Sequence, residues 1–227
     1  MEDPRYQNLS ARLAETGLAL RGGFYPDAAD SVPPAAPGRA SRTLLLIGNT
    51  GPDIWPHFAP YDDGKPDALD RWTRAVIEPI ASDCGARCVF PFDRPPLPFQ
   101  RWAQRSEPVA SSPLGILIHP DHGLWHAYRA ALLFSDVVAL PAPDNRPSPC
   151  ETCADQPCLS ACPVEAFGSD GYDVPVCAAY LETPGGSDCL DGGCQARNAC
   201  PVAADRRYHP DQIRFHMRAF RRAVTRG

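Results

Sequence analysis

The stretch CETCADQPCLSACPVEAF, residues 150–167, places four cysteines within thirteen positions and follows the last of them with Pro163. Four further cysteines come by position 200, and the last of these is also followed by a proline, Pro201. Thiols at this density serve disulfide bonds, zinc or iron–sulfur clusters. The compartment of the protein and the spacing of the cysteines decide between these uses.

The amino terminus and the composition indicate a cytoplasmic protein. The start, MEDPRYQNLS, has neither a charged segment before an apolar run nor a twin-arginine pair, so it does not read as an export signal. No apolar stretch reaches membrane-spanning length, and we expect no membrane contact. A reducing compartment keeps thiols free or bound to metal, which disfavours disulfides. The net charge of -5 argues against a nucleic-acid partner.

The cysteine spacing is typical of a two-cluster ferredoxin. A tight loop wraps three thiolates around one four-iron cluster, and the fourth cysteine of the run, followed by proline, binds the neighbouring cluster. This crossing rule predicts two [4Fe–4S] clusters. The first would be bound by Cys150, Cys153, Cys158 and Cys200, and the second by Cys162, Cys177, Cys189 and Cys194.

Zinc is the main alternative for these thiols. Structural zinc sites use paired CxxC knuckles, and only Cys150 with Cys153 has that spacing. The wider gaps of both runs depart from the compact bacterial ferredoxin spacing, so the assignment of single ligands and the nuclearity of one cluster stay open. Cys84 and Cys88 lie outside the module and are read as buried free thiols.

Apolar patterns predict the elements around this module. Helical spacing predicts helices over residues 6–20, 67–80 and 122–134, and Pro79 should kink or end the second. Short apolar runs predict strands over residues 43–49, 86–92, 114–119 and 136–140. A last helix should begin at Pro210, and its arginines are typical of a solvated face. The proline-rich run 141–149 marks a boundary between a domain over residues 1–145 and a cysteine-rich domain over residues 146–227.

A second motif, IHPDHGLWHAYRAALL, covers residues 118–133. His122 and His126 are spaced like a zinc pair, but no glutamate lies between them, so a zinc protease is not favoured. His119 ends a predicted strand, a position where residues commonly face a ligand, and a hydrogen-bonded core histidine is the alternative. The motif resembles that of the cobalamin-processing CblC family, with Leu124 where that family has a second glycine. Epoxyqueuosine reductases and reductive dehalogenases carry a related segment followed by a cysteine-rich module, and VCAAYLE around Cys177 is similar to a segment of the former.

This resemblance implies an α+β fold, with a nitroreductase-like domain followed by a small two-cluster ferredoxin-like domain. It further implies a bound corrinoid such as cobalamin, with its lower base displaced, beside clusters that pass electrons to cobalt. His119, Gly123, Trp125 and Arg129 match the family motif and are carried over as corrinoid-side residues. The implied electron source is an external donor, a reductase or a ferredoxin. Whether the chain forms a homodimer, as nitroreductase relatives often do, stays open.

Two functional hypotheses follow. The first is an iron–sulfur oxidoreductase that reductively removes the upper axial ligand of a corrinoid. The alternative is an electron-transfer ferredoxin or partner subunit without a corrinoid, or one whose pocket accepts another tetrapyrrole or a flavin. Turnover of cyanocobalamin distinguishes the first from a carrier.

Overall fold

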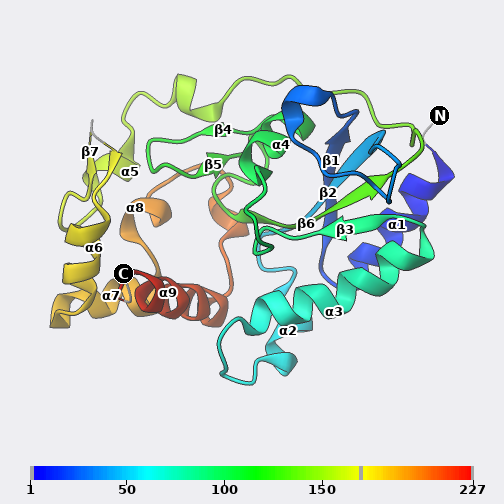
Figure 1. Cartoon of the computed structure of the whole chain (residues 1–227). Coiled ribbons are helices and arrows are strands. Elements are labelled where there is room, and N and C mark those ends of the chain that lie inside the picture. Colours follow the sequence, from blue (N-terminus) through cyan, green and yellow to red (C-terminus); the bar gives the residue numbers. More distant parts are fainter. Residues whose placement is uncertain (1–2, 169–170, 226–227) are drawn as a thin grey trace. The chain divides into compact units, whose positions relative to one another are not determined.

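The computed structural model describes residues 3–168 and 171–225, and the chain folds as two compact units (Figure 1). Unit 1 contains the chain up to Pro108 together with His126–Asn145. Unit 2 contains Val109–Trp125 together with the chain from Arg146 onward. The division differs from the predicted one, because the segment Val109–Trp125 interrupts unit 1 in sequence and folds with the cysteine-rich part.

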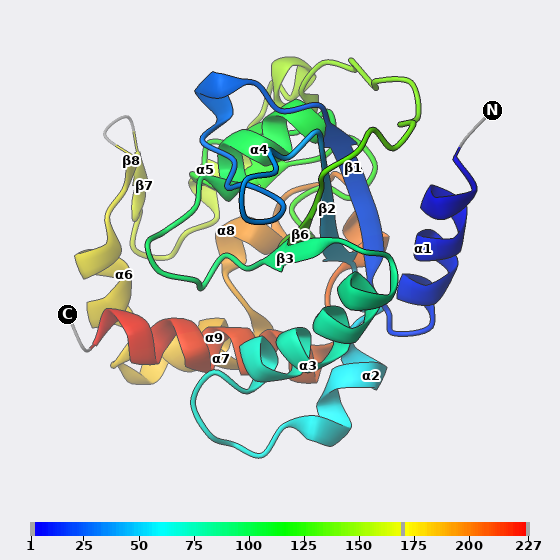
Figure 2. The same cartoon turned by 45° about the vertical axis from the view of Figure 1, so that its right-hand side comes forward.

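Unit 1 is built on an antiparallel sheet, which in the described part of the chain has four strands in the order β1-β2-β6-β3. The strands are β1 Ala19–Phe24, β2 Thr43–Thr50, β3 Arg87–Val89 and β6 His126–Phe134. Its helices are α1 Pro4–Ala14, α2 Trp55–Phe58, α3 Ala68–Asp83 and α4 Phe99–Ser106, with 3₁₀ turns η1 Ala28–Asp30 and η2 Ala59–Tyr61. Figure 2 shows α3 and α4 on opposite sides of the sheet, which explains why residues 44–47 of β2 are completely buried.

The expected strand over residues 43–49 is confirmed as β2, but the expected helix over residues 122–134 is wrong. That segment forms β6, which pairs with β2 on one side and with β3 on the other. Residues 130–134 are buried one after another, as in a central strand covered on both faces, whereas an amphipathic helix would expose part of them. The recurrence of Tyr128 and Leu132 at helical spacing therefore reflected a continuous apolar run.

The two other helix predictions in unit 1 needed correction at their ends. Helix α1 ends at Ala14 rather than near residue 20, because the chain turns at Gly17 with φ 71° and enters β1. Pro79 does not end α3, which continues to Asp83. One missing backbone hydrogen bond costs less than exposing the apolar face that includes the buried Ile77 and Ile80.

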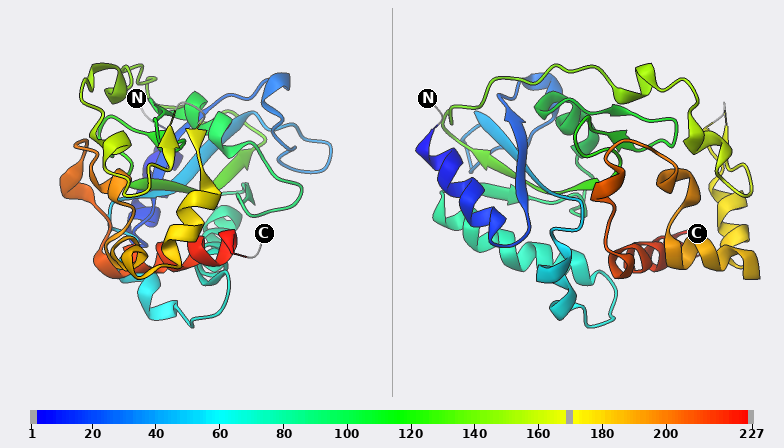
Figure 3. Two further views of the ribbon diagram at one scale, coloured as in Figure 1. Left: turned by 90° about the vertical axis from the view of Figure 1, so that its left-hand side faces the viewer. Right: turned by 180° about the vertical axis from the view of Figure 1, so that it is seen from behind.

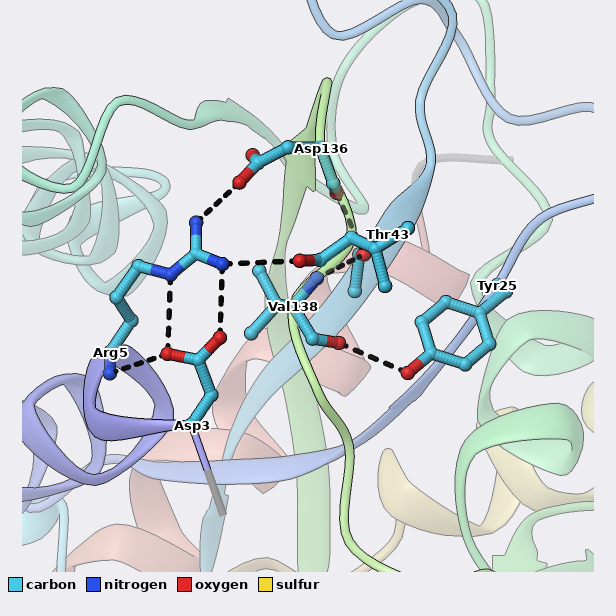
Figure 4. Close-up of polar contacts among 7 residues, drawn as sticks. Asp3, Arg5, Tyr25, Thr43, Asp136 and Val138 are labelled. Carbon is cyan, nitrogen blue, oxygen red and sulfur yellow. Dashed lines mark hydrogen bonds and ion pairs between the residues drawn. The ribbon is translucent and has the colours of Figure 1, made fainter. Parts of the chain in front are cut away.

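Residues 136–140, expected as a strand, lie outside the strands and are bound by side chains (Figure 4). Thr43 Oγ1 donates to the Asp136 carbonyl oxygen at 2.9 Å and accepts from the Val138 amide at 3.0 Å. The Tyr25 hydroxyl donates to the Val138 carbonyl oxygen at 3.1 Å, and the Arg5 guanidinium binds the Asp136 carboxylate. Side chains thus satisfy backbone groups that a neighbouring strand would otherwise satisfy.

Unit 2 consists of short elements around a small core. Two hairpins are formed by β4 Ala110–Ser111 with β5 Leu117–Ile118 and by β7 Phe167–Gly168 with β8 Gly171–Tyr172. The helices are α5 Pro157–Ser160, α6 Val174–Leu181, α7 Ser187–Gly192, α8 Gln195–Asn198 and α9 Pro210–Val224, with 3₁₀ turns η3 Pro149–Thr152, η4 Pro184–Gly186 and η5 Ala204–Arg206. Helix α9, expected from Pro210, lies against α7 and α6 (Figure 3). The mixture of helices and antiparallel strands confirms the α+β class. No helix among the described residues is long and apolar enough to cross a membrane.

The hydroxyl of Thr43 offers a test of how residues 136–140 are held. Replacing Thr43 with Val keeps the shape but leaves the buried Val138 amide and the Asp136 carbonyl without their partner, so we expect the free energy of unfolding to fall by about 1–3 kcal/mol. Urea unfolding followed by circular dichroism measures this. The Thr43→Ser variant retains the hydroxyl and is the control, and equal stability of the two variants would contradict the assignment.

Candidate metal centre

The first cysteine set, Cys150, Cys153, Cys158 and Cys200, combines one tight loop with a distant residue. Cys150 lies in η3, Cys153 ends that turn, and Cys158 lies in α5. The Cys150 and Cys158 thiols both lie within electrostatic reach of Cys200 and Cys153. Burial raises the pKa of the Cys150 and Cys158 thiols, and the neighbouring thiols raise it further. Without a cation these thiols favour the protonated form, so metal binding here would release protons.

Local capping explains the shape of this loop. The Ser148 hydroxyl accepts a hydrogen bond from the Cys150 amide, and the Glu151 carboxylate accepts one from the Ser148 amide, both at 3.3 Å. This capping box winds the η3 turn directly at the first cysteine. Gln156, in the left-handed region with φ 38°, then turns the chain into α5. Two turns therefore bring three thiols into one loop.

The second cysteine set, Cys162, Cys177, Cys189 and Cys194, is assembled from four separate segments. Cys177 lies in α6, Cys189 in α7, and Cys194 immediately before α8. The Cys189 thiol is within electrostatic reach of Cys177 and Cys162, and the Cys194 thiol is within reach of Cys189 and Cys177. Burial raises the pKa of both Cys189 and Cys194. The structure thus gathers the same two groups of four that the crossing rule grouped, while their role as ligands stays a prediction.

Hydrogen-bond donors lie beside the sulfurs of the second set. The Ala166 amide donates to Cys162 Sγ at 3.3 Å. The Tyr172 ring stacks on Phe167 with centroids 4.6 Å apart and lies beside the Cys177 thiol. Burial, and then hydrogen bonding with Cys177, raises the pKa of the Tyr172 hydroxyl, which therefore stays protonated and able to donate. Hydrogen bonds to sulfur are one means by which a protein sets the potential of a cluster.

A zinc ion and a four-iron cluster require different spacings of the thiols that bind them. Within the described ranges, no three His, Cys, Asp or Glu side chains converge closely enough to hold one metal ion. A zinc site brings every sulfur to about 2.3 Å from the same ion. A four-iron cluster binds each thiolate through a different iron atom, so its ligands stand farther apart.

The IHP motif forms a closed loop in unit 2. The His119 amide donates to the Gly123 carbonyl oxygen at 2.9 Å, and the Gly123 amide returns a bond to the His119 carbonyl oxygen at 2.8 Å. His119 Nδ1 accepts from the Asp121 amide at 3.0 Å, and the His119 and His122 rings stack with centroids 4.4 Å apart. His119 itself is buried. These contacts fix the loop tightly.

The same loop is locked against the segment that follows Cys200. Gly123 has φ 54°, and a Cβ atom at this position would lie 2.2 Å from the Val202 carbonyl oxygen. Only glycine tolerates both the left-handed backbone and this approach. The glycine of the motif therefore places residues 118–125 beside the first cysteine set.

Arg197 joins the motif to the cysteine-rich segment. Its guanidinium lies 4.4 Å from the centroid of the Trp125 ring and 4.7 Å from that of Tyr208, and Nη2 donates to the Leu124 carbonyl oxygen at 2.5 Å. Cation–π contacts of this kind are strongest where water is excluded, and Trp125 is 1 % exposed. Arg197 stands three residues after Cys194 and three before Cys200, so its contacts join the motif to the segment that carries these two cysteines.

Leu124 belongs to the small core of unit 2. It packs with Leu114, Ile118, Ala196 and Cys200. A cavity of about 30 Å³ lies beside Trp125 and Arg197, enough for a water molecule, and the buried Trp125 Nε1 and Arg197 Nε have no hydrogen-bond partner among the described residues. Within unit 2, His119, Leu124 and Trp125 are therefore engaged in packing, and this cavity is far too small for a corrinoid ring.

Arg129, the fourth residue of the predicted corrinoid group, lies in unit 1 on β6. Its Nε donates to Asn49 Oδ1 at 3.0 Å, and Asn49 is completely buried. Cys84 and Cys88 also belong to unit 1 and are half-buried rather than buried. The structure thus collects His119, Gly123 and Trp125 in one unit and leaves Arg129 in the other.

Solved structures share this fold. CblC from C. elegans, a B12-trafficking protein, superposes with a TM-score of 0.54 at 16% identity over 98% of this chain and 96% of that chain. The chain has the fold of CblC. Epoxyqueuosine reductase from Streptococcus thermophilus follows with a TM-score of 0.51 at 13% identity, over 91% of this chain and 69% of that one. A selenomethionine-labelled epoxyqueuosine reductase gives 0.50 at 14%, over 91% and 68%. No family model and no curated protein matches the sequence.

The predicted resemblance to CblC and epoxyqueuosine reductases is confirmed at the level of the fold. Sequence reasoning missed Arg197, Val202 and Tyr208, which hold the motif against the cysteine-rich segment. The sequence offered no signal for Arg197, because its role depends on contacts with the distant residues Leu124 and Trp125. No pattern in the sequence marks a backbone oxygen such as that of Val202.

A pair of glycines tests the locked loop. Replacing Gly123 with Ala forces a Cβ into the Val202 carbonyl oxygen, so we expect unit 2 to lose stability by several kcal/mol and to take up less iron. Gly115→Ala is the control, because Gly115 has a similar φ of 74° but nothing within 4 Å of its added Cβ, and should cost only about 1–2 kcal/mol. Thermal unfolding and iron analysis measure both, and equal losses in the two variants would refute the clash.

Proposed function

We propose that the protein is an iron–sulfur oxidoreductase that binds two [4Fe–4S] clusters and passes electrons from them to a bound corrinoid. The observation that carries the proposal is the meeting of eight thiols in two groups of four, in a unit whose IHP motif is locked beside the first group. The clusters would supply one-electron transfer, and the corrinoid would supply a cobalt centre from which an upper ligand can be removed.

The residues of unit 2 prepare this chemistry. The two cysteine sets supply thiolates, while the Ala166 amide and the Tyr172 hydroxyl lie beside sulfurs of the second set. Arg197 holds the motif against the cysteine-rich segment through the Trp125 ring and the Leu124 carbonyl oxygen. Burial of Cys189 and Cys200 limits the access of water. Within unit 2, His119, Leu124 and Trp125 of the motif are engaged in packing.

The ligand sets can be tested by counting iron in double variants. Cys150→Ala should remove one cluster and lower the iron from about eight atoms per chain to about four. Adding Cys200→Ala should remove no further iron, because both residues belong to the first set, whereas adding Cys162→Ala should remove nearly all of it. Iron and sulfide analysis of anaerobic preparations measures this.

The control for that series is Cys84→Ala with Cys88→Ala, in unit 1, which should retain all the iron. The reverse result, in which Cys150→Ala with Cys162→Ala keeps one cluster, would show that the run binds its own four thiols to a single cluster. Zinc in place of iron and sulfide would reject the cluster proposal as a whole.

The corrinoid part of the proposal is supported by the IHP motif and by the shared fold with CblC, a protein named for B12 trafficking. Hydroxocobalamin added to the anaerobic protein should change its absorption spectrum to that of the base-off form, in which the lower base has left cobalt. Cyanocobalamin should then be converted when the clusters are reduced. An unchanged spectrum at excess cobalamin would remove the corrinoid from the proposal and leave the clusters untouched.

A second function is favoured by the burial of the motif. His119, Leu124 and Trp125 are 5 %, 2 % and 1 % exposed, as expected if the loop only supports the clusters. The protein would then be an electron carrier or partner subunit. A carrier would be reduced by a donor and oxidised by an acceptor protein without converting cyanocobalamin.

A further inference from the structure

The charges of the chain are separated along the sequence. Residues 204–227 contain seven arginines and two aspartates, a formal charge of +5, so the preceding 203 residues carry -10 of the total of -5. Helix α9 presents a group of these arginines, Arg214, Arg218, Arg221 and Arg222, which we call the arginine face. Their spacing of four, three and one residues places them on one side of the helix.

The opposite side of α9 lies against the second cysteine set. The Phe220 ring stacks on Tyr172 with centroids 6.4 Å apart, and Tyr172 adjoins the Cys177 thiol. Ile213 approaches Gly193, the residue before Cys194. The arginine face therefore stands about one helix diameter, roughly 10 Å, from the second set. Helix α9 contacts α7 and α6, the helices that carry Cys189 and Cys177 (Figure 3).

Two of the four arginines of the arginine face lack an ion-pair partner in the described part of the chain. Arg221 pairs with Glu182, the residue that ends α6, at 2.6 and 2.8 Å, and Arg214 pairs with Asp211. Arg218 and Arg222 are exposed and have no ion-pair or hydrogen-bond partner in the described part of the chain. These two unpaired guanidinium groups, beside the two paired ones, form a local positive surface on an acidic protein.

We propose that the arginine face is the docking surface for an acidic one-electron carrier protein, such as a flavodoxin or a small ferredoxin, which reduces the cluster of the second cysteine set. This inference rests on the proposed function and names the donor class and its point of entry. One electron leaves the reduced centre of the donor and enters the cluster. No bond forms or breaks, and the donor is oxidised by one electron as the cluster is reduced by one.

Charge favours a protein partner over a nucleic acid. A long polyanion would extend past a single helix of 15 residues and meet the field of a chain that is otherwise strongly acidic. A small acidic protein is complementary in charge to the arginine face, and it can dock there without contacting the acidic surface elsewhere on the chain. The arginine face also lies close to a predicted redox centre, which suits a partner that carries electrons.

Charge reversal tests the docking surface. The double variant Arg218→Glu with Arg222→Glu and the wild type, both loaded with clusters, are mixed anaerobically with reduced flavodoxin as the probe, and the rate of flavin oxidation is followed by stopped flow. We expect the second-order rate constant of the variant to fall on the order of tenfold at low ionic strength, and the difference to shrink at high salt.

Two controls separate docking from other effects. The double variant Arg39→Glu with Arg101→Glu changes the net charge by the same amount at exposed sites of unit 1, and it should react with flavodoxin nearly as the wild type does. Reduced methyl viologen, a small cation that needs no arginine surface, should reduce the clusters of all three proteins without a loss of rate in the α9 variant.

The outcomes are distinct. Three results would overturn the docking surface. Viologen but not flavodoxin could reduce the wild type, the α9 variant could react with flavodoxin as fast as the wild type, or both double variants could be slowed equally. The docking surface would also be overturned if the α9 variant lost the ability to bind an RNA stem-loop but still reacted with flavodoxin at the wild-type rate. A protein that binds no clusters, or whose clusters viologen cannot reduce, contradicts the proposed function itself.

Discussion

The carbonyl oxygen of Val202 leaves no room for a side chain at position 123, and this contact joins two segments that are far apart in sequence. Through it the loop of the IHP motif meets the residues that directly follow Cys200. Arg197 reinforces the same junction, since it binds the Leu124 carbonyl oxygen and lies against the Trp125 ring. The position of the motif relative to the first cysteine set depends on this junction.

Unit 2 is made mostly of short elements. Its core around the motif consists of five residues, and most of its helices are one or two turns long. Apolar burial on this scale stabilises a unit weakly. Eight thiols gathered in two groups offer a further source of stability, because metal binding to a folded site adds its free energy to folding. In the proposed function the cysteines would therefore stabilise the unit as well as bind the clusters.

Arginines serve two opposite purposes in this unit. Arg197 lies against two aromatic rings, those of Trp125 and Tyr208, and acts inside the unit by holding the motif in place. Arg218 and Arg222 are exposed on the far side of α9 and act outward. The sequence alone suggested only a solvated face for α9, because helical spacing shows which arginines lie together but not what lies behind them.

The sequence by itself determined the elements that depend on local pattern and spacing. It indicated the α+β class, the buried strand β2, the helix that begins at Pro210 and the resemblance to CblC, and it grouped the eight cysteines into two sets of four. It failed at β6, because an apolar run that is buried on both faces carries no periodicity to separate strand from helix. Only the tertiary structure decided that residues 109–125 fold with the cysteine-rich part, that Arg197 clamps the motif, and that α9 covers the second set. Those facts depend on contacts between distant segments, and a backbone oxygen such as that of Val202 leaves no trace in the pattern of side chains.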